Sequence, residues 1–144
     1  MSPEKRAHVC RHEAGHAIVA MHYGVLVRQV TVGTGENVTR HANGSREHNL
    51  MITAAGIAVS GIADPGAWAD VIQILDDLKL KDASGEAMRA AVFPLVDVAR
   101  EILERHADTH DALTERLIDY GSLEENELAW FARRVEERNI ARRD

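Results

Sequence analysis

One run of five residues, His-Glu-Ala-Gly-His at positions 12–16, constrains this chain more than any other part of its sequence. In an α-helix, residues four apart lie one turn apart on the same face, so the two histidines would point in the same direction. The flanking sequence favours such a helix, because Ser2 is a good N-cap residue and Gly24 occupies a C-terminal cap position. We therefore predict a helix over residues 3–23.

This spacing is that of the H-E-x-x-H metal-binding motif. The imidazoles of His12 and His16 can both reach one metal ion, and Glu13 can take a proton from a water molecule that the metal activates. A third protein ligand from elsewhere would leave a coordination position open for that water. The alternative is a helix whose histidines only pack in the core or face solvent. The strong helix signals around the motif favour the metal-binding interpretation.

The third ligand has several candidates. His22 would point away from the motif if the helix continues, since Val19 stands where a chain reversal would need glycine. His8 lies one turn before His12, but three ligands on one straight helix cannot surround an ion tetrahedrally. Asp70, near the start of a later helix, is the preferred candidate, although the helix dipole alone favours aspartate there. The other candidates are carboxylates of the later segments: Glu47, Asp64, Asp76 and Asp77.

The length and composition are those of an ordinary globular protein. We treat residues 1–144 as a single domain, long enough to bury a core, with 45% hydrophobic and 28% charged residues. The net charge of −6 argues against a nucleic-acid partner. The most apolar run, residues 50–63, is too short to cross a membrane, no secretory signal is visible, and the single cysteine, Cys10, excludes an intrachain disulfide. We expect a soluble, cytoplasmic protein without a membrane partner.

The pattern along the chain predicts a mainly α, compact helical domain with a small β element after the first helix. Residues 25–32 are rich in β-branched side chains and predict a strand, and residues 33–46 predict an exposed loop. Pro94 predicts a kink or split in a long helical stretch, and a capping-box pattern at residues 122–125 starts a final helix. We also predict helices over residues 47–62 and 65–80, and the long helical stretch covers residues 85–120.

The remaining histidines and aromatic residues receive simpler interpretations. His106 and His110 also stand four apart, but no glutamate follows His106, so we expect an exposed helical turn and no second metal site. His41 and His48 lie in or beside the polar loop, where we expect them to face solvent. Three aromatic residues are expected to pack in the core or between helices: Trp68, Trp130 and Phe131.

Four segments together resemble the zinc peptidase domain of the FtsH-type ATP-dependent proteases. Residues 12–20 resemble that family's zinc-motif helix, and residues 30–32 resemble the strand that follows it. Gly-Ala-Trp-Ala-Asp-Val at residues 66–71 resembles the family's Gly-Ala-x-Asn-Asp-Leu segment, and residues 91–127 resemble its closing helices. The resemblance implies a Zn²⁺ ion with a catalytic glutamate, Glu13, and three metal ligands: His12, His16 and Asp70.

The chain also departs from that family. It has no P-loop pattern, and neither the ATPase domain nor the membrane helices of the full-length proteases are present. The family's Gly-Arg-Ala-Ala-Glu-Glu segment corresponds to Gly-Ile-Ala-Val-Ser-Gly at residues 56–61, and Ala69 replaces the asparagine before the third ligand. These changes leave the implied zinc ligands and the base in place.

The sequence therefore predicts a stand-alone, ATP-independent zinc metalloendopeptidase that cuts peptides or flexible protein segments. The strand over residues 25–32 could pair with an extended substrate if it forms a sheet edge. A homo-oligomer or a separate ATPase partner is consistent with the resemblance. The alternative is a catalytically weak or inactive zinc-binding module that interacts with another protein, which the altered segment at residues 56–61 favours.

Overall fold

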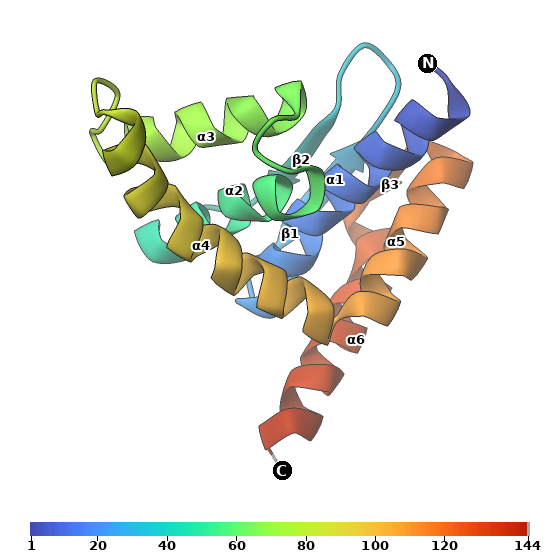
Figure 1. Ribbon diagram of the computed structural model, residues 1–144. Helices are drawn as coiled ribbons and strands as arrows, with labels where there is room; N and C mark the ends of the chain where they lie inside the picture. Colours follow the sequence, from blue (N-terminus) through green and yellow to red (C-terminus); the bar gives the residue numbers. More distant parts are fainter. Residues whose placement is uncertain (144) are drawn as a thin grey trace.

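The computed structural model describes residues 1–143, which form a mainly helical fold with a small three-stranded sheet (Figure 1). This confirms the predicted fold class. The elements, in chain order, are α1 (Pro3–His22), β1 (Val27–Thr31), β2 (Val38–His41), α2 (Arg46–Ser60), α3 (Pro65–Asp77), α4 (Gly85–Arg105), α5 (Ala107–Tyr120), β3 (Ser122–Glu124) and α6 (Glu125–Arg143). None of the helices described combines the length and apolarity that crossing a membrane requires.

Helix α1 lies at the centre, with α2, α5, α6 and the sheet packed around it (Figure 1). Its small side chains allow this, because Ala14 and Ala17 are fully buried and neighbouring elements can approach closely. Gly15 marks the closest approach: a Cβ atom there would lie 2.7 Å from Cγ2 of Val59 on α2. The central position of α1 explains why a helix that carries charged and polar side chains is nevertheless mostly buried.

Local capping interactions set the starts of four helices. The side chain of Ser2 accepts a hydrogen bond from the amide of Lys5, which confirms the predicted start of α1. Corresponding side-chain caps begin α2, α3 and α4, at Ser45, Asp64 and Ser84. Because these caps are encoded within a few residues, the predicted starts of these helices agree with the structure to within one or two positions.

The sheet has the strand order β2-β1-β3, with both pairings antiparallel. Val30 of β1 faces Thr39 of β2 on one side and Leu123 of β3 on the other. The first strand could pair with a substrate only if it formed a sheet edge, and this condition is not met, because β1 is the central strand. The predicted loop over residues 33–46 contains β2, which is one of the two edge strands of the sheet.

Two boundaries in the second half also differ from the predictions. Helix α4 continues through Pro94, which lies on its exposed side. The helical stretch is interrupted instead at His106, between α4, which packs on α2, and α5, which packs on α1. Ser122 does not cap α6 but belongs to β3, and Glu127 of α6 accepts a hydrogen bond from the amide of Glu124. This bond from a backbone amide to a glutamate side chain is one of the two hydrogen bonds of a capping box, and it forms two residues after the predicted position.

His106, His110 and two of the three aromatic residues differ from the sequence interpretation. His106 and His110 are 2% and 6% exposed, so they do not form an exposed turn. Phe131 is buried as expected, whereas Trp68 and Trp130 are about half exposed. Each of these outcomes depends on which helix covers which face, and this is decided by tertiary packing.

Candidate metal centre

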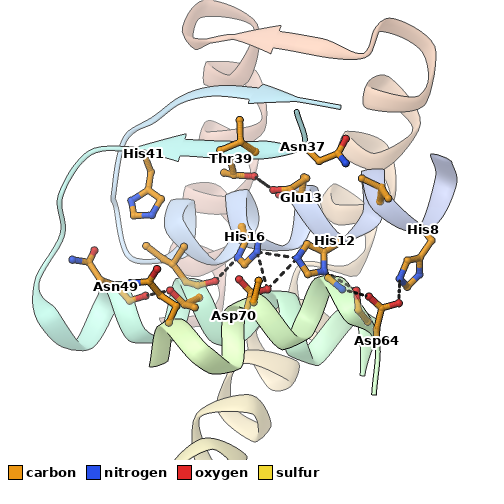
Figure 2. A pocket seen from close by; sticks show the side chains of 18 of the residues that line it. His8, His12, Glu13, His16, Asn37, Thr39, His41, Asn49, Asp64 and Asp70 are labelled. Atoms are coloured by element: carbon orange, nitrogen blue, oxygen red, sulfur yellow. Dashed lines mark hydrogen bonds and ion pairs between the residues drawn. The ribbon is translucent and has the colours of Figure 1, made fainter. Parts of the chain in front are cut away.

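The structure brings His12, His16 and Asp70 together from two helices far apart in the sequence (Figure 2). The Nε2 atoms of the two histidines on α1 lie 3.2 Å apart. Oδ2 of Asp70 on α3 lies 3.1 Å from Nε2 of His12 and 3.4 Å from Nε2 of His16. Three atoms of the kinds that bind zinc therefore converge on one point.

The opposite ring nitrogens are held by α2. Nδ1–H of His16 donates to the carbonyl oxygen of Ile52 at 2.7 Å, and Nδ1 of His12 lies 2.6 Å from the hydroxyl of Ser60. A carbonyl can only accept, so the neutral imidazole of His16 carries its proton on Nδ1 and has a lone pair on Nε2. Partners of this kind fix the tautomer and orientation of metal-binding histidines.

The electrostatics of the cluster are compatible with a bound cation. Oδ2 of Asp70 is buried, and it lies within 3.4 Å of the Nε2 atoms of both His12 and His16. Burial acts to lower the pKa of His16, but the hydrogen bond and charge of Asp70 outweigh it and raise that pKa to about 9. Burial acts to raise the pKa of Asp70, yet the two histidines hold it below its ordinary value. Facing lone pairs and a buried carboxylate are stabilised only when a proton or a metal ion lies among them.

Gly56 on α2 forms the floor beneath these three side chains. A Cβ atom at this position would lie 2.7 Å from Cε1 of both His12 and His16 and would collide with Oδ2 of Asp70. Real Cβ atoms do not approach other atoms so closely, so only glycine allows the donor groups to meet here. The donor set and this space both fit a metal ion bound by two imidazoles and one carboxylate.

Glu13 lies beside this cluster and is held by the sheet. Its carboxylate Oε1 is 2.9 Å from the hydroxyl of Thr39 on β2, and the same hydroxyl lies 2.9 Å from the backbone carbonyl of Glu13. Glu13 is only 7% exposed, but it lines an open cleft together with the metal-binding candidates. A carboxylate in this position can exchange a proton with a molecule bound in the cleft.

The cleft has a volume of about 790 Å³ and lies between β2 and α3 (Figure 2). His41 and Asn49 stand at one end, and His8 and Asp64 at the other, where Nε2 of His8 is 3.0 Å from the Asp64 carboxylate. His41 therefore lines the cleft, whereas sequence reasoning expected it to face solvent. His48, for which solvent was also expected, is stacked on the ring of Tyr23.

The other candidate ligands lie elsewhere. Nδ1 of His22 is 3.0 Å from Nε2 of His106 at the far end of α1, in agreement with the prediction that it points away from the motif. Nε2–H of His110 donates to the carbonyl of Arg11, so His106 and His110 face different partners and share no metal site among the described residues. Asp76 pairs with Lys81, and Glu47 is exposed outside the cleft.

Sequence reasoning did not identify three residues that shape the site, namely Gly56, Ser60 and Thr39. Gly56 and Ser60 lie in the segment at residues 56–61 that differs from the family pattern, and Thr39 lies in the predicted loop over residues 33–46. Their roles depend on how α2 and β2 pack against α1, which no local pattern encodes.

Comparison with known proteins finds no family model that matches this chain and no curated protein that is similar to it. The residues and geometry of the site itself are therefore the basis for assigning a function.

Proposed function

We propose that this chain is a zinc-dependent metalloendopeptidase that acts without ATP. The observation that supports this best is the convergence of two imidazole nitrogens and one carboxylate oxygen over Gly56, beside a second carboxylate in an open cleft. A structural zinc site is usually closed by four protein ligands, whereas here three ligand atoms meet at a cleft. The resemblance of residues 12–20 and 66–71 to FtsH-type peptidase domains supports the same proposal.

In this proposal His12, His16 and Asp70 hold the zinc ion. Zinc bound there would supply a Lewis acid that polarises the peptide carbonyl and lowers the pKa of water to roughly 7. Glu13 accepts the proton of the attacking water and then donates it to the amine that leaves. The hydroxyl of Thr39 holds the Glu13 carboxylate in the cleft, at 2.9 Å. Ser60 and Ile52 keep the two imidazoles turned toward Asp70.

The substrate in this proposal is an extended peptide that lies along β2. The outer edge of β2 is unpaired in the sheet, and Val38, Thr39 and His41 line the cleft. An extended chain can add to such an edge through main-chain hydrogen bonds. A folded protein could not enter in this way, so the enzyme would cut flexible segments unless a separate partner unfolds its substrates.

The test is the substitution Glu13→Gln. We expect the variant to bind zinc as the wild type does and to lose hydrolysis of an unstructured protein such as casein, by about 100-fold or more. Glu47→Gln is a matched control, because Glu47 is exposed and lies outside the cleft. Equal casein hydrolysis by the Glu13→Gln variant would refute the assigned role. Tight zinc binding without hydrolysis by the wild type would favour the zinc-binding interaction module.

A further inference from the structure

The walls of the cleft carry an unbalanced charge. The described residues that line it include four carboxylates and no lysine or arginine. Two of these carboxylates, Glu13 and Asp70, belong to the proposed catalytic centre, and a third, Asp64, is paired with His8. The fourth is Asp77, and no cationic side chain of the described residues lies within ion-pair distance of its carboxylate.

Asp77 is the last residue of α3 and lies on the face of that helix that lines the cleft. Gly66, Asp70, Gln73 and Asp77 share this face, at successive intervals of four, three and four residues. Among the described residues, the carboxylate of Asp77 accepts hydrogen bonds from the amide of Gln73 alone, at 3.2 and 3.4 Å.

Two basic side chains lie near the end of α3, but neither forms an ion pair with the Asp77 carboxylate. Arg46 at the start of α2 donates to the backbone carbonyl of Asp77, at 3.0 Å, and does not line the cleft. Lys81 pairs with the neighbouring Asp76. The Asp77 carboxylate therefore stays available to a positive group that enters the cleft.

Other polar side chains that line the cleft already have hydrogen-bond partners. The amide of Asn49 bonds to Asn43 and Gly44, and the hydroxyl of Thr53 donates to the carbonyl of Asn49. Nδ1–H of His41 donates to the carbonyl of the next residue, Ala42. The polar end of the cleft thus offers acceptors, the Asp77 carboxylate above all, and few free donors.

We propose that this end of the cleft is a cation subsite, and that the enzyme prefers peptide segments with a lysine or arginine near the bond that is cut. The inference deepens the proposed peptidase function and depends on it for the cleavage step. Asp77 lies two helical turns from Asp70, about 10 Å along α3. Alternate side chains of an extended peptide are about 7 Å apart, so a basic side chain one or two residues from the cut bond can reach Asp77.

The first test measures cleavage of short fluorescence-quenched peptides that differ only in one residue. Lysine, leucine or glutamate is placed in turn at each of the positions flanking the bond, so the direction of the bound peptide is determined from the same data. We expect lysine to exceed glutamate in kcat/KM by about fivefold or more at one position, with a smaller preference at high salt. Asp77→Asn should abolish the preference. Asp76→Asn, the same change on the exposed neighbour, should leave it intact.

The second test separates the subsite from the chemistry. Binding of the lysine and glutamate peptides to the zinc-loaded Glu13→Gln protein is measured by fluorescence anisotropy, with and without Asp77→Asn. Tighter binding of the lysine peptide that depends on Asp77 supports the subsite even if the wild type cuts nothing, a result that would refute only the peptidase proposal. Equal affinities, a preference that survives Asp77→Asn, or no binding of the lysine peptide up to about 1 mM would overturn the subsite.

Discussion

Replacing Gly56 by alanine tests the geometry of the metal centre most directly. The added Cβ would lie 2.7 Å from Cε1 of both His12 and His16 and would overlap Oδ2 of Asp70. Carbon atoms in contact prefer separations of about 3.5 to 4.0 Å, so each ring must move by about 1 Å. Functional constellations tolerate displacements of only about 0.5 Å. We therefore expect the affinity for zinc to fall by about 100-fold or more, which corresponds to a loss of about 2.7 kcal/mol.

The effect on stability should be smaller than the effect on metal affinity. Alanine in a helix interior is favoured over glycine by up to about 1 kcal/mol, and overpacking costs about 1–3 kcal/mol. These contributions oppose each other, and in the metal-free protein the donor side chains can turn away from the new methyl group. Urea unfolding in the presence of a chelator should show a destabilisation of at most about 2 kcal/mol.

The assay is a competition titration of zinc against a chelating dye, with Gly85→Ala as the control. Gly85 also lies in a helix, α4, and its new Cβ would meet only the flexible end of Arg89, at an ordinary contact distance of 3.6 Å. We expect this variant to keep the zinc affinity of the wild type. If Gly56→Ala binds zinc as tightly as the wild type does, the three side chains do not meet over Gly56 in solution and the reasoning is wrong.

Three further predictions concern groups around the centre and at the far end of α1. Thr39→Val should leave zinc binding unchanged but lower kcat by about tenfold or more, because Glu13 loses its hydroxyl partner. Thr39→Ser, which keeps the hydroxyl, should have the activity of the wild type. A valine variant with normal kcat would contradict the assigned role. Ser60→Ala should weaken zinc binding by about tenfold, whereas Ser60→Thr, which keeps the hydroxyl, should not, as measured with the same dye. His106 should make the protein acid-sensitive, since burial, helped by the charges of His22 and Arg105, lowers its pKa from 6.5 to about 4. The unfolded chain binds this proton below about pH 6.5, whereas the folded protein binds it only below about pH 4. The free energy of unfolding is therefore highest above pH 6.5, and it falls by up to roughly 3 kcal/mol as the pH approaches 4. Urea unfolding at several pH values would show this slope, and a flat profile between pH 6.5 and 4 would refute it.

The parts of the fold that could be predicted from sequence are those that short-range chemistry determines. Helix α1 follows from Ser2 as its cap and from the buried alanines in its middle. The first strand follows from its β-branched residues. The spacing of His12 and His16 likewise fixes their common face wherever the helix is placed, so their proximity was predictable without knowledge of the tertiary structure.

The parts that could not be predicted depend on contacts between distant segments. Strand β2 is four residues long, and its Val-Thr-Arg-His sequence shows no strong alternation, so only pairing with β1 makes it a strand. Pro94 is tolerated because it lies on the exposed side of α4, and the break at His106 arises because the next helix must pack on α1. The roles of Gly56 and Ser60 require α2 to cross beneath α1, which a sequence alone does not reveal.

The position of α3 has a mechanical consequence for the cleft. This helix packs on α2 and α4, and it reaches α1 chiefly through Asp70 and through the His8–Asp64 pair at its start. An ion shared by Asp70 and the two histidines would therefore join the first helix to the opposite wall of the groove. Metal binding should then strengthen the contact between α1 and α3, and stabilise the folded chain, as well as supply the reactive centre.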